Sequence, residues 1–308
     1  MWWSVTELLS VVVPTHNRPD RLETAVRSVL DQTGPPVEVV VVDDGSQAPT
    51  AEVLDRLSAD PRVVVLRNDV PQGAAAARNR GIDVARGDLV GFCDDDDLWL
   101  PGAASAAAEA LRPSIGVVYG YHEVSIESTG RLVTFRPPAR ATPEMMRWLN
   151  VPAVPMAVVR RSVVGDELYF DTDLLMSEDW DLWLRCADQA PVVLAPHPFY
   201  RYVQHAGFRV TAVTEADLVS HRRFLDKHRS SMTAACVAHY EFALALMAKD
   251  AGIARGELAK LPRHPTILAA GALIATEVVA SRLGQRRKDP GLRSRVAVGL
   301  LGPVIAKG

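Results

Sequence analysis

Four consecutive aspartates at positions 94–97 are the residues of this chain whose type and spacing most directly suggest chemistry. They follow the apolar segment 87–93, which we expect to be a buried strand. Because alternate residues of a strand point the same way, Asp94 and Asp96 are predicted to face one ion, with Asp95 turned aside. Such oxygen donors suit Mg²⁺ or Mn²⁺ and leave coordination positions for water and substrate phosphates. A solvated acidic loop is the alternative.

Two further polar clusters follow predicted strands: Thr15-His16-Asn17 and Asp43-Asp44-Gly45-Ser46. The strands expected in this part are 10–14, 37–42, 63–66 and 87–93, and the helices between them are 19–31, 49–58 and 73–85. Continuous apolar runs and regular βα alternation predict an α/β fold with a doubly wound, mostly parallel sheet. In such a sheet ligands bind beyond the carboxyl ends of the strands, so the three clusters are expected to form one site.

The alternation weakens after residue 121. There we expect a hairpin over 122–136, a short helix over 143–150, strands at 156–159, 192–194 and 199–202, and a helix after Ser177. Ser177 is a good N-cap, and Glu178 and Asp179 suit the positive end of the helix dipole. The pattern from about residue 215 is helical, so the predicted domains are 1–214, with the sheet, and 215–308, a helical C-terminal extension.

Composition excludes several classes of protein. The 308 residues carry a net charge of −3, which gives no electrostatic reason to expect a nucleic-acid partner. Three cysteines without Cys-x-x-Cys spacing argue against a disulfide framework or structural zinc site and favour the cytoplasm. We also expect no secretory signal at the N-terminus and no transmembrane helix, since no apolar run reaches about 18 residues.

The end of the chain is basic. From Arg282 onward there are seven basic residues and one acidic residue, a local excess of +6, beside the apolar segments 265–283 and 292–306. Such helices can lie on an anionic membrane, so peripheral contact with the inner face of the membrane is one interpretation. Packing on the sheet domain and a homodimer interface are the others.

Five segments resemble, in order, the motifs of the inverting family 2 glycosyltransferases, whose nucleotide-sugar-binding α/β fold is called the A fold. The segments are 11–19, 41–46, 73–81, 94–101 and 178–185. The resemblance spans residues 9–211. It implies an enzyme that uses a metal ion to transfer a sugar from a nucleotide-diphosphate sugar, most often UDP-linked, with inversion. The acceptor hydroxyl would belong to an envelope glycan, a lipid-linked glycan or a small molecule.

The resemblance also implies roles for single residues. Pro14 and Thr15 would line the nucleotide pocket, Asp44 would bond the base, and Arg78 would lie near the base or phosphates. The expected donor-binding residues also include Asn17 and Asp95, the latter because of its place in the acidic run. Two alternatives stay open: the turn at 43–46 could cap the helix 49–58, and Arg78 could simply solvate the helix 73–85.

The metal ligands implied by the resemblance are Asp94, Asp96 and His205, with Asp96 the more direct. The ion, Mn²⁺ or Mg²⁺, would bridge the diphosphate and neutralise charge on the leaving group. Asp179, beside Glu178, falls at the position of the general base, which takes the proton from the acceptor hydroxyl.

Three other functions stay open at this point. A sugar nucleotidyltransferase also binds nucleotide and metal on an α/β sheet, but it would need a glycine-rich loop where 14–19 has no glycine. A receiver-type signalling domain would leave 122–211 unexplained. A non-catalytic nucleotide-sugar-binding protein of the same fold is the third.

Overall fold

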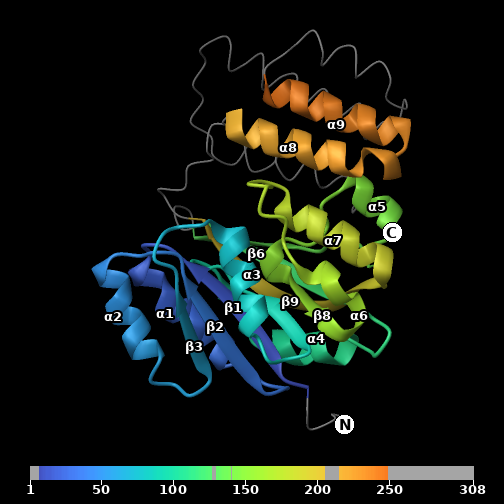
Figure 1. The fold of residues 1–308 in the computed structure, drawn as a ribbon. Coiled ribbons are helices and arrows are strands. Elements are labelled where there is room, and N and C mark those ends of the chain that lie inside the picture. The colour runs from blue at the N-terminus through green and yellow to red at the C-terminus, as the bar shows by residue number, and fades with distance from the viewer. Residues whose placement is uncertain (1–6, 127–129, 140, 205–214, 249–308) are drawn as a thin grey trace. The chain divides into compact units, whose positions relative to one another are not determined.

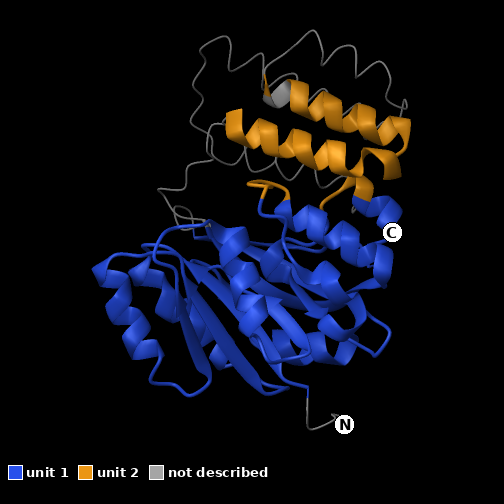
Figure 2. Ribbon diagram, in the orientation of Figure 1, with its two compact units in different colours: residues 1–146, 151–172, 178–208 blue, residues 147–150, 173–177, 209–308 orange. Residues whose placement is uncertain are grey.

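A computed structural model of the chain describes residues 7–126, 130–139, 141–204 and 215–248 (Figure 1). The chain folds into two compact units (Figure 2). One comprises residues 1–146, 151–172 and 178–208, and the other comprises 147–150, 173–177 and 209–308. The predicted boundary near residue 214, His205 and the basic C-terminal segment lie outside the described residues, so these expectations stay predictions.

The first unit is built on a sheet that has nine strands among the described residues. They are β1 (Leu9–Thr15), β2 (Val37–Asp43), β3 (Val63–Arg67), β4 (Leu89–Phe92), β5 (Leu98–Trp99), β6 (Val117–Ile126), β7 (Arg131–Phe135), β8 (Ala157–Arg160) and β9 (Val192–Gln204). Their order is β3-β2-β1-β4-β8-β6-β9-β5, and β7 pairs with β6. The stretch β3-β2-β1-β4 is parallel, β6 and β9 are also parallel, and the other pairs are antiparallel.

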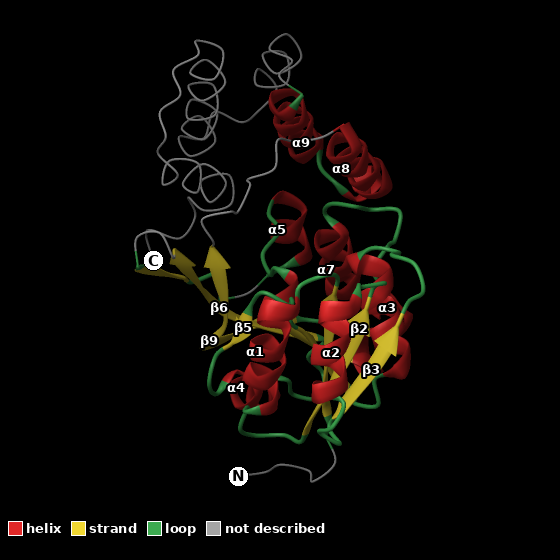
Figure 3. Ribbon diagram, turned by 90° about the vertical axis from the view of Figure 1, so that its left-hand side faces the viewer, coloured by secondary structure: helices red, strands yellow, loops and turns green. Residues whose placement is uncertain are grey.

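Helices cover both faces of this sheet. The α-helices up to residue 189 are α1 (Pro19–Leu30), α2 (Ala48–Leu57), α3 (Ala74–Val84), α4 (Ala103–Ala110), α5 (Pro143–Trp148), α6 (Arg161–Val164) and α7 (Glu178–Gln189), with 3₁₀ turns at Val154–Met156 and Gly165–Leu168. Figure 3 shows α1 and α4 on one side of the strands and α3 on the other. Val11 and Val13 of β1 belong to the core shared with α1, whereas Val12 faces α3. The predicted doubly wound α/β fold is therefore confirmed.

The sequence patterns differ from the structure in two places. Residues 192–204 form one strand rather than two, with register irregularities opposite Tyr119 and Tyr121. The two-residue strand β5 was not predicted, because so short a segment has no periodicity to detect.

The second unit contains a helix pair, α8 (Glu215–His228) and α9 (Ala234–Met247), joined through a 3₁₀ turn at Arg229–Ser231. Arg222 and Arg229 both pair with Glu241 of α9, and the rings of Phe224 and Tyr240 stack with centroids 5.4 Å apart. Among the described helices, none combines the length and the apolar composition needed to cross a membrane.

Glycine at position 81 lets α3 lie close to the sheet. A Cβ atom there would come within 2.3 Å of Cγ1 of Val12 on β1. Real side chains do not approach so closely, so only glycine allows this spacing without displacing the helix. The close approach sets the position of α3 and hence of Arg78, one turn earlier.

The charged side chain of Glu38 lies inside the parallel sheet. Glu38 of β2 is 1% exposed and accepts hydrogen bonds from Ser10 Oγ (2.5 Å), the Arg86 backbone N–H (2.7 Å) and Arg86 Nε (2.6 Å). Burial alone raises the pKa of Glu38, but these bonds outweigh it and hold the pKa below its usual value. Glu38 therefore interrupts the apolar run 37–42 without an uncompensated charge.

We expect Glu38→Gln to lower the free energy of unfolding by about 1.5–3 kcal/mol, because charged hydrogen bonds in a buried position are lost. Urea denaturation at neutral pH measures this change. Glu23→Gln is the control, because Glu23 pairs with Arg27 on the surface of α1 and should cost less than about 1 kcal/mol. Equal effects of the two substitutions would contradict a special role for Glu38.

Candidate active site

The aspartates at 94–97 form a tight turn, which we call the carboxylate turn. Strand β4 ends at Phe92, and the Asp97 N–H donates to the Asp94 carbonyl over 3.1 Å. The strand alternation from which we predicted that Asp94 and Asp96 face one ion therefore does not extend to Asp94–Asp97, and a shared ion between Asp94 and Asp96 stays a prediction. A turn does not have the two-residue period of a strand.

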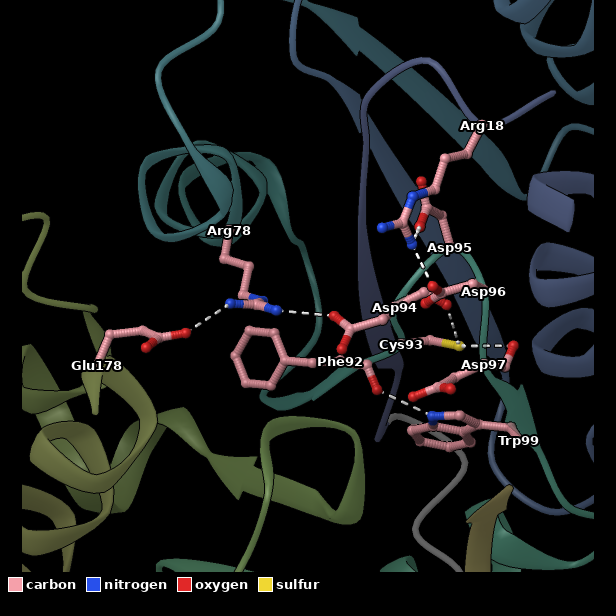
Figure 4. A network of polar contacts seen from close by, with 10 residues as sticks. All are labelled: Arg18, Arg78, Phe92, Cys93, Asp94, Asp95, Asp96, Asp97, Trp99 and Glu178. Atoms are coloured by element: carbon pink, nitrogen blue, oxygen red, sulfur yellow. Dashed lines mark hydrogen bonds and ion pairs between the residues drawn. The ribbon is translucent and has the colours of Figure 1, made fainter. Parts of the chain in front are cut away.

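Two arginines neutralise the carboxylate turn from opposite sides (Figure 4). Arg18, which follows β1, pairs with Asp96 and lies 3.2 Å from Oδ1 of Asp95. Arg78 of α3 donates from Nη2 to Oδ1 of Asp94 over 2.7 Å. The predicted ligands Asp94 and Asp96 thus contact different guanidinium groups.

Arg78 also reaches the acidic pair Glu178–Asp179. Its Nη1 lies 3.4 Å from Oε1 of Glu178, at the start of α7, so one buried guanidinium joins Asp94 to Glu178. The guanidinium carbon lies 5.4 Å from the centre of the Phe170 ring. Phe170 is itself fixed by reciprocal 2.8 Å hydrogen bonds between its backbone and the Asn79 side chain. Arg78 is therefore held in place by packing as well as by charge.

Exposure distinguishes the four aspartates as metal ligands. The side chains of Asp94 and Asp96 are 33% and 28% exposed, whereas Asp95 is 8% exposed and the whole of Asp97 is 3% exposed. Among the described residues, no group of three or more His, Cys, Asp or Glu side chains gathers to hold an ion. Two accessible carboxylates fit a Mg²⁺ or Mn²⁺ ion that takes its remaining ligands from substrate phosphates and water.

The two buried aspartates have strongly shifted pKa values. Burial raises the pKa of Asp97 to about 9, and the charges of Asp94 and Asp96 add to the rise. Burial also raises the pKa of Asp95 to about 6, although a 2.8 Å hydrogen bond from Thr15 and the charge of Arg18 oppose it. The raised pKa of Asp97 favours its protonated form at neutral pH, and the neutral form lowers the repulsion in the turn.

The ends of β1 and β2 form a second polar network. Asp44 is buried and accepts from Asn68 Nδ2 (2.7 Å), Gln72 N (2.8 Å) and Gly73 N (2.8 Å), so it fixes the loop before α3. Asn17 has a left-handed φ of 54°; its N–H donates to Ser46 and its side-chain oxygen accepts from Gln47 N, both at 2.8 Å. The alternative that this turn caps the helix expected at 49–58 is not supported, because α2 has no side-chain cap hydrogen bond and Asp44 bonds the loop before α3 instead. The base-binding role of Asp44 stays a prediction.

Helix α7 begins at the acidic pair. Burial raises the pKa of Glu178 to about 7, the charge of Asp179 raises it further, and Arg78 opposes the rise. One Asp179 oxygen accepts from Trp180 N at 2.7 Å. Ser177 has a φ of 64° instead of the extended backbone of an ordinary N-cap. Asn17 and Ser177 are the non-glycine residues with left-handed backbone in the described part, and both flank this site.

The structure brings most of the predicted residues together. Thr15 bonds Asp95, which shares Arg18 with Asp96. Arg78 links Asp94 to Glu178, and Asp179 adjoins Glu178 in sequence. The backbone of the carboxylate turn joins these two sets of contacts. Asn17 and Asp44 belong to the second network, and Pro14 precedes Thr15 in β1. Arg18 and Asp97 were not predicted. Arg18 lies within the motif segment 11–19 and Asp97 within 94–101, and this position in a motif was the feature of the sequence that could have indicated them.

Each arginine should control the pKa of its own carboxylate. We expect Arg78→Gln to raise the pKa of Glu178 above its value of about 7, because a nearby cation that favours ionisation is removed. Arg18→Gln should instead raise the pKa of Asp95 above about 6 and leave Glu178 unchanged. Carbon-13 NMR titration of the metal-free protein measures both. An unaltered Glu178 titration in Arg78→Gln would contradict the bridge.

Comparison with known proteins gives the family. The model of the family described as "Glycosyl transferase family 2" matches residues 10–166. An uncharacterised protein of Mycobacterium tuberculosis is 30% identical over 244 residues, which cover 72% of this chain and 74% of that protein. The Escherichia coli UDP-Glc:alpha-D-GlcNAc-diphosphoundecaprenol beta-1,3-glucosyltransferase WfaP is 28% identical over 58% of this chain and 69% of its own length.

Solved structures show the same fold at lower identity. The structure of residues 1–349 of Staphylococcus aureus TarS in complex with UDP-GlcNAc has a TM-score of 0.59 and 18% identity, covering 89% of this chain and 81% of that one. A mannosyltransferase from Pyrobaculum calidifontis, in complex with GDP-Man and Mn²⁺, has a TM-score of 0.60 and 21% identity, covering 94% and 83%. The solved structures show the fold, and the family model with the sequence relatives sets aside the nucleotidyltransferase, receiver and non-catalytic alternatives. The chain belongs to glycosyl transferase family 2 and is a glycosyltransferase.

Proposed function

We propose that this glycosyltransferase is metal-dependent and inverting, and that it transfers a sugar from a UDP-linked donor to a hydroxyl of a lipid-linked glycan. One observation carries the proposal. Arg78 joins Asp94 of the carboxylate turn to Glu178 of the acidic pair, which brings the expected donor-binding and catalytic segments to one place. Those segments are far apart in sequence, and their meeting at Arg78 supports a shared site.

The donor would be bound beyond the ends of β1, β2 and β4. Pro14, Thr15 and Asp44 would line the nucleoside pocket, and the Asn17 loop would close one side. A divalent ion held by Asp94 and Asp96 would supply neutralising charge to the diphosphate as it leaves. His205 stays a candidate third ligand from the sequence. Arg18 and Arg78 are positioned to stabilise the same negative charge.

The base is assigned to Asp179. Inverting transfer is one displacement, so the base must take the acceptor proton on the side of the sugar away from the diphosphate. Glu178 is drawn toward Arg78, whose other end contacts Asp94 in the proposed metal site. Because of its place in the motif 178–185, the neighbouring Asp179 is the carboxylate we assign to the acceptor. The pKa of Glu178, about 7, makes it the competing candidate, since a base works best near the ambient pH.

The acceptor class rests on relatives. The Escherichia coli relative and a Campylobacter jejuni relative, 36% identical over 40% of this chain, are named for acceptors on diphosphoundecaprenol or PP-undecaprenol. A lipid-linked acceptor would place the enzyme on the inner face of the membrane, where the basic segment after Arg282 could contact anionic lipids. The other acceptor classes are an envelope glycan without lipid and a small molecule. Transfer assays that supply each class in turn to the purified protein would distinguish them from a lipid-linked acceptor.

A thermal-shift screen of UDP, GDP, dTDP and CDP sugars, with and without Mn²⁺, tests donor and metal together. We expect a UDP-sugar with Mn²⁺ to stabilise the protein by about 2.7 kcal/mol at about 100 times its dissociation constant. Asp96→Asn should remove the part of this stabilisation that depends on Mn²⁺. Asp31 is exposed at the end of α1, so Asp31→Asn should leave that part unchanged. A shift that is equal in excess chelator would refute the metal role, and no shift with any donor would refute the function.

Substitution of the acidic pair tests the base. Asp179→Asn keeps the size of the side chain but cannot take a proton, so transfer should fall by roughly 10²-fold or more while donor affinity stays within a few-fold. Glu178→Gln is the matched control and should be the milder change. Release of nucleotide diphosphate measures transfer, and calorimetry measures donor binding. If Glu178→Gln lowered transfer more than Asp179→Asn, Glu178 would be the base. If both variants kept near-normal transfer, α7 would carry no catalytic base.

A further inference from the structure

The segment that leads into the acidic pair is tied to α8. Residues 173–177 belong to the second unit, and the chain enters the first unit between Ser177 and Glu178. Within the second unit, side chains of Ser220, His221 and Arg223 make four hydrogen bonds to this segment among the described contacts. Such a density of contacts on five residues calls for an explanation beyond helix packing.

Ser220 fixes the backbone of Met176 on both sides. Its Oγ accepts from the Met176 N–H at 2.9 Å and donates to the Met176 carbonyl at 2.8 Å. Ser220 is only 2% exposed, so water does not readily replace these bonds. A hydroxyl that bonds both backbone groups of one residue sets the direction of the chain as it leaves that residue.

His221 and Arg223 hold the ends of the same segment. Nδ1 of His221 lies 2.8 Å from Oγ of Ser177, the left-handed residue just before Glu178. Arg223 donates from Nη1 to the Asp173 carbonyl over 3.1 Å. The left-handed backbone conformation of Ser177 persists only where neighbouring groups hold it in place.

Hydrophobic packing does not explain how the segment is held near its end. Leu174 is 2% exposed and anchors the beginning, but Leu175 and Met176 are 66% and 43% exposed. The backbone between Leu174 and Glu178 therefore depends on polar contacts with α8 for its conformation.

We propose that Ser220 and His221 are positioning residues for sugar transfer: they fix the backbone from which Glu178 and Asp179 project. The inference rests on the proposed function, since it takes Asp179 as the base. A base displaced by about 1 Å loses much of its effect, with losses on the order of 10²-fold, while donor binding is untouched.

The test compares α8 variants of the full chain in steady-state transfer assays. Ser220→Ala and His221→Phe should lower kcat by about 10-fold or more and leave the donor KM within about 3-fold. His221→Asn keeps a polar atom near the place of Nδ1 and should recover most of kcat. Arg222→Ala is the matched control, because Arg222 pairs with Glu241 of α9 rather than with residues 173–177. Its kcat should stay near that of the wild type.

Hydrogen exchange gives a readout that does not need activity. The Met176 amide should exchange at least about 10-fold faster in Ser220→Ala than in the wild type or Arg222→Ala. Normal kcat in Ser220→Ala, or equal losses of kcat in Ser220→Ala and Arg222→Ala, would overturn the inference. A wild-type protein that transfers no sugar would overturn the proposed function instead, and unchanged Met176 exchange would by itself refute the hold of α8 on the segment.

Discussion

Repulsion among like charges in the carboxylate turn is the constraint on which the rest of the site depends. Four aspartates in one turn cannot all stay ionised without partners. Three features meet this constraint: Arg18 pairs with Asp95 and Asp96, Arg78 pairs with Asp94, and burial raises the pKa of Asp97, which favours its neutral form. Each arginine comes from a different part of the fold. Compensation of the charge is therefore also what joins β1, β4, α3 and the start of α7.

The fold prepares these meetings before any charge is considered. Parallel strands β1, β2 and β4 end at one edge of the sheet, and the polar residues that follow them meet there. Gly81 brings α3 close to β1, Asp44 fixes the loop that precedes α3, and Phe170 supports the Arg78 guanidinium. Arg78 is thus placed by ordinary packing and hydrogen bonding. Its two acidic partners, Asp94 and Glu178, then share this cation and add to the forces that hold it.

Much of the fold could be predicted from the sequence, because apolar runs and βα alternation directly reflect burial in a parallel sheet. The doubly wound fold and the elements up to β4 follow from that pattern, and the order of the motifs indicated the family. The orientation of Asp94–Asp97 could not be predicted, since it depends on β4 ending at Phe92. Arg18 was missed because its partner Asp95 lies 77 positions away, and such pairing leaves no local pattern. The left-handed backbone of Ser177 was missed for a similar reason: its hydroxyl contact is with His221, 44 positions away.

The central claim is that the carboxylate turn binds a divalent ion together with the donor diphosphate and not as a complete protein site. Electron paramagnetic resonance of free Mn²⁺ titrated with the protein, with and without saturating UDP, tests this claim most directly. Two carboxylates alone should bind Mn²⁺ weakly, and UDP should tighten the binding by about 10-fold or more, a coupling of about 1.4 kcal/mol, with Mn²⁺ tightening UDP by the same factor. Mn²⁺ affinity that is the same with and without UDP would contradict the account.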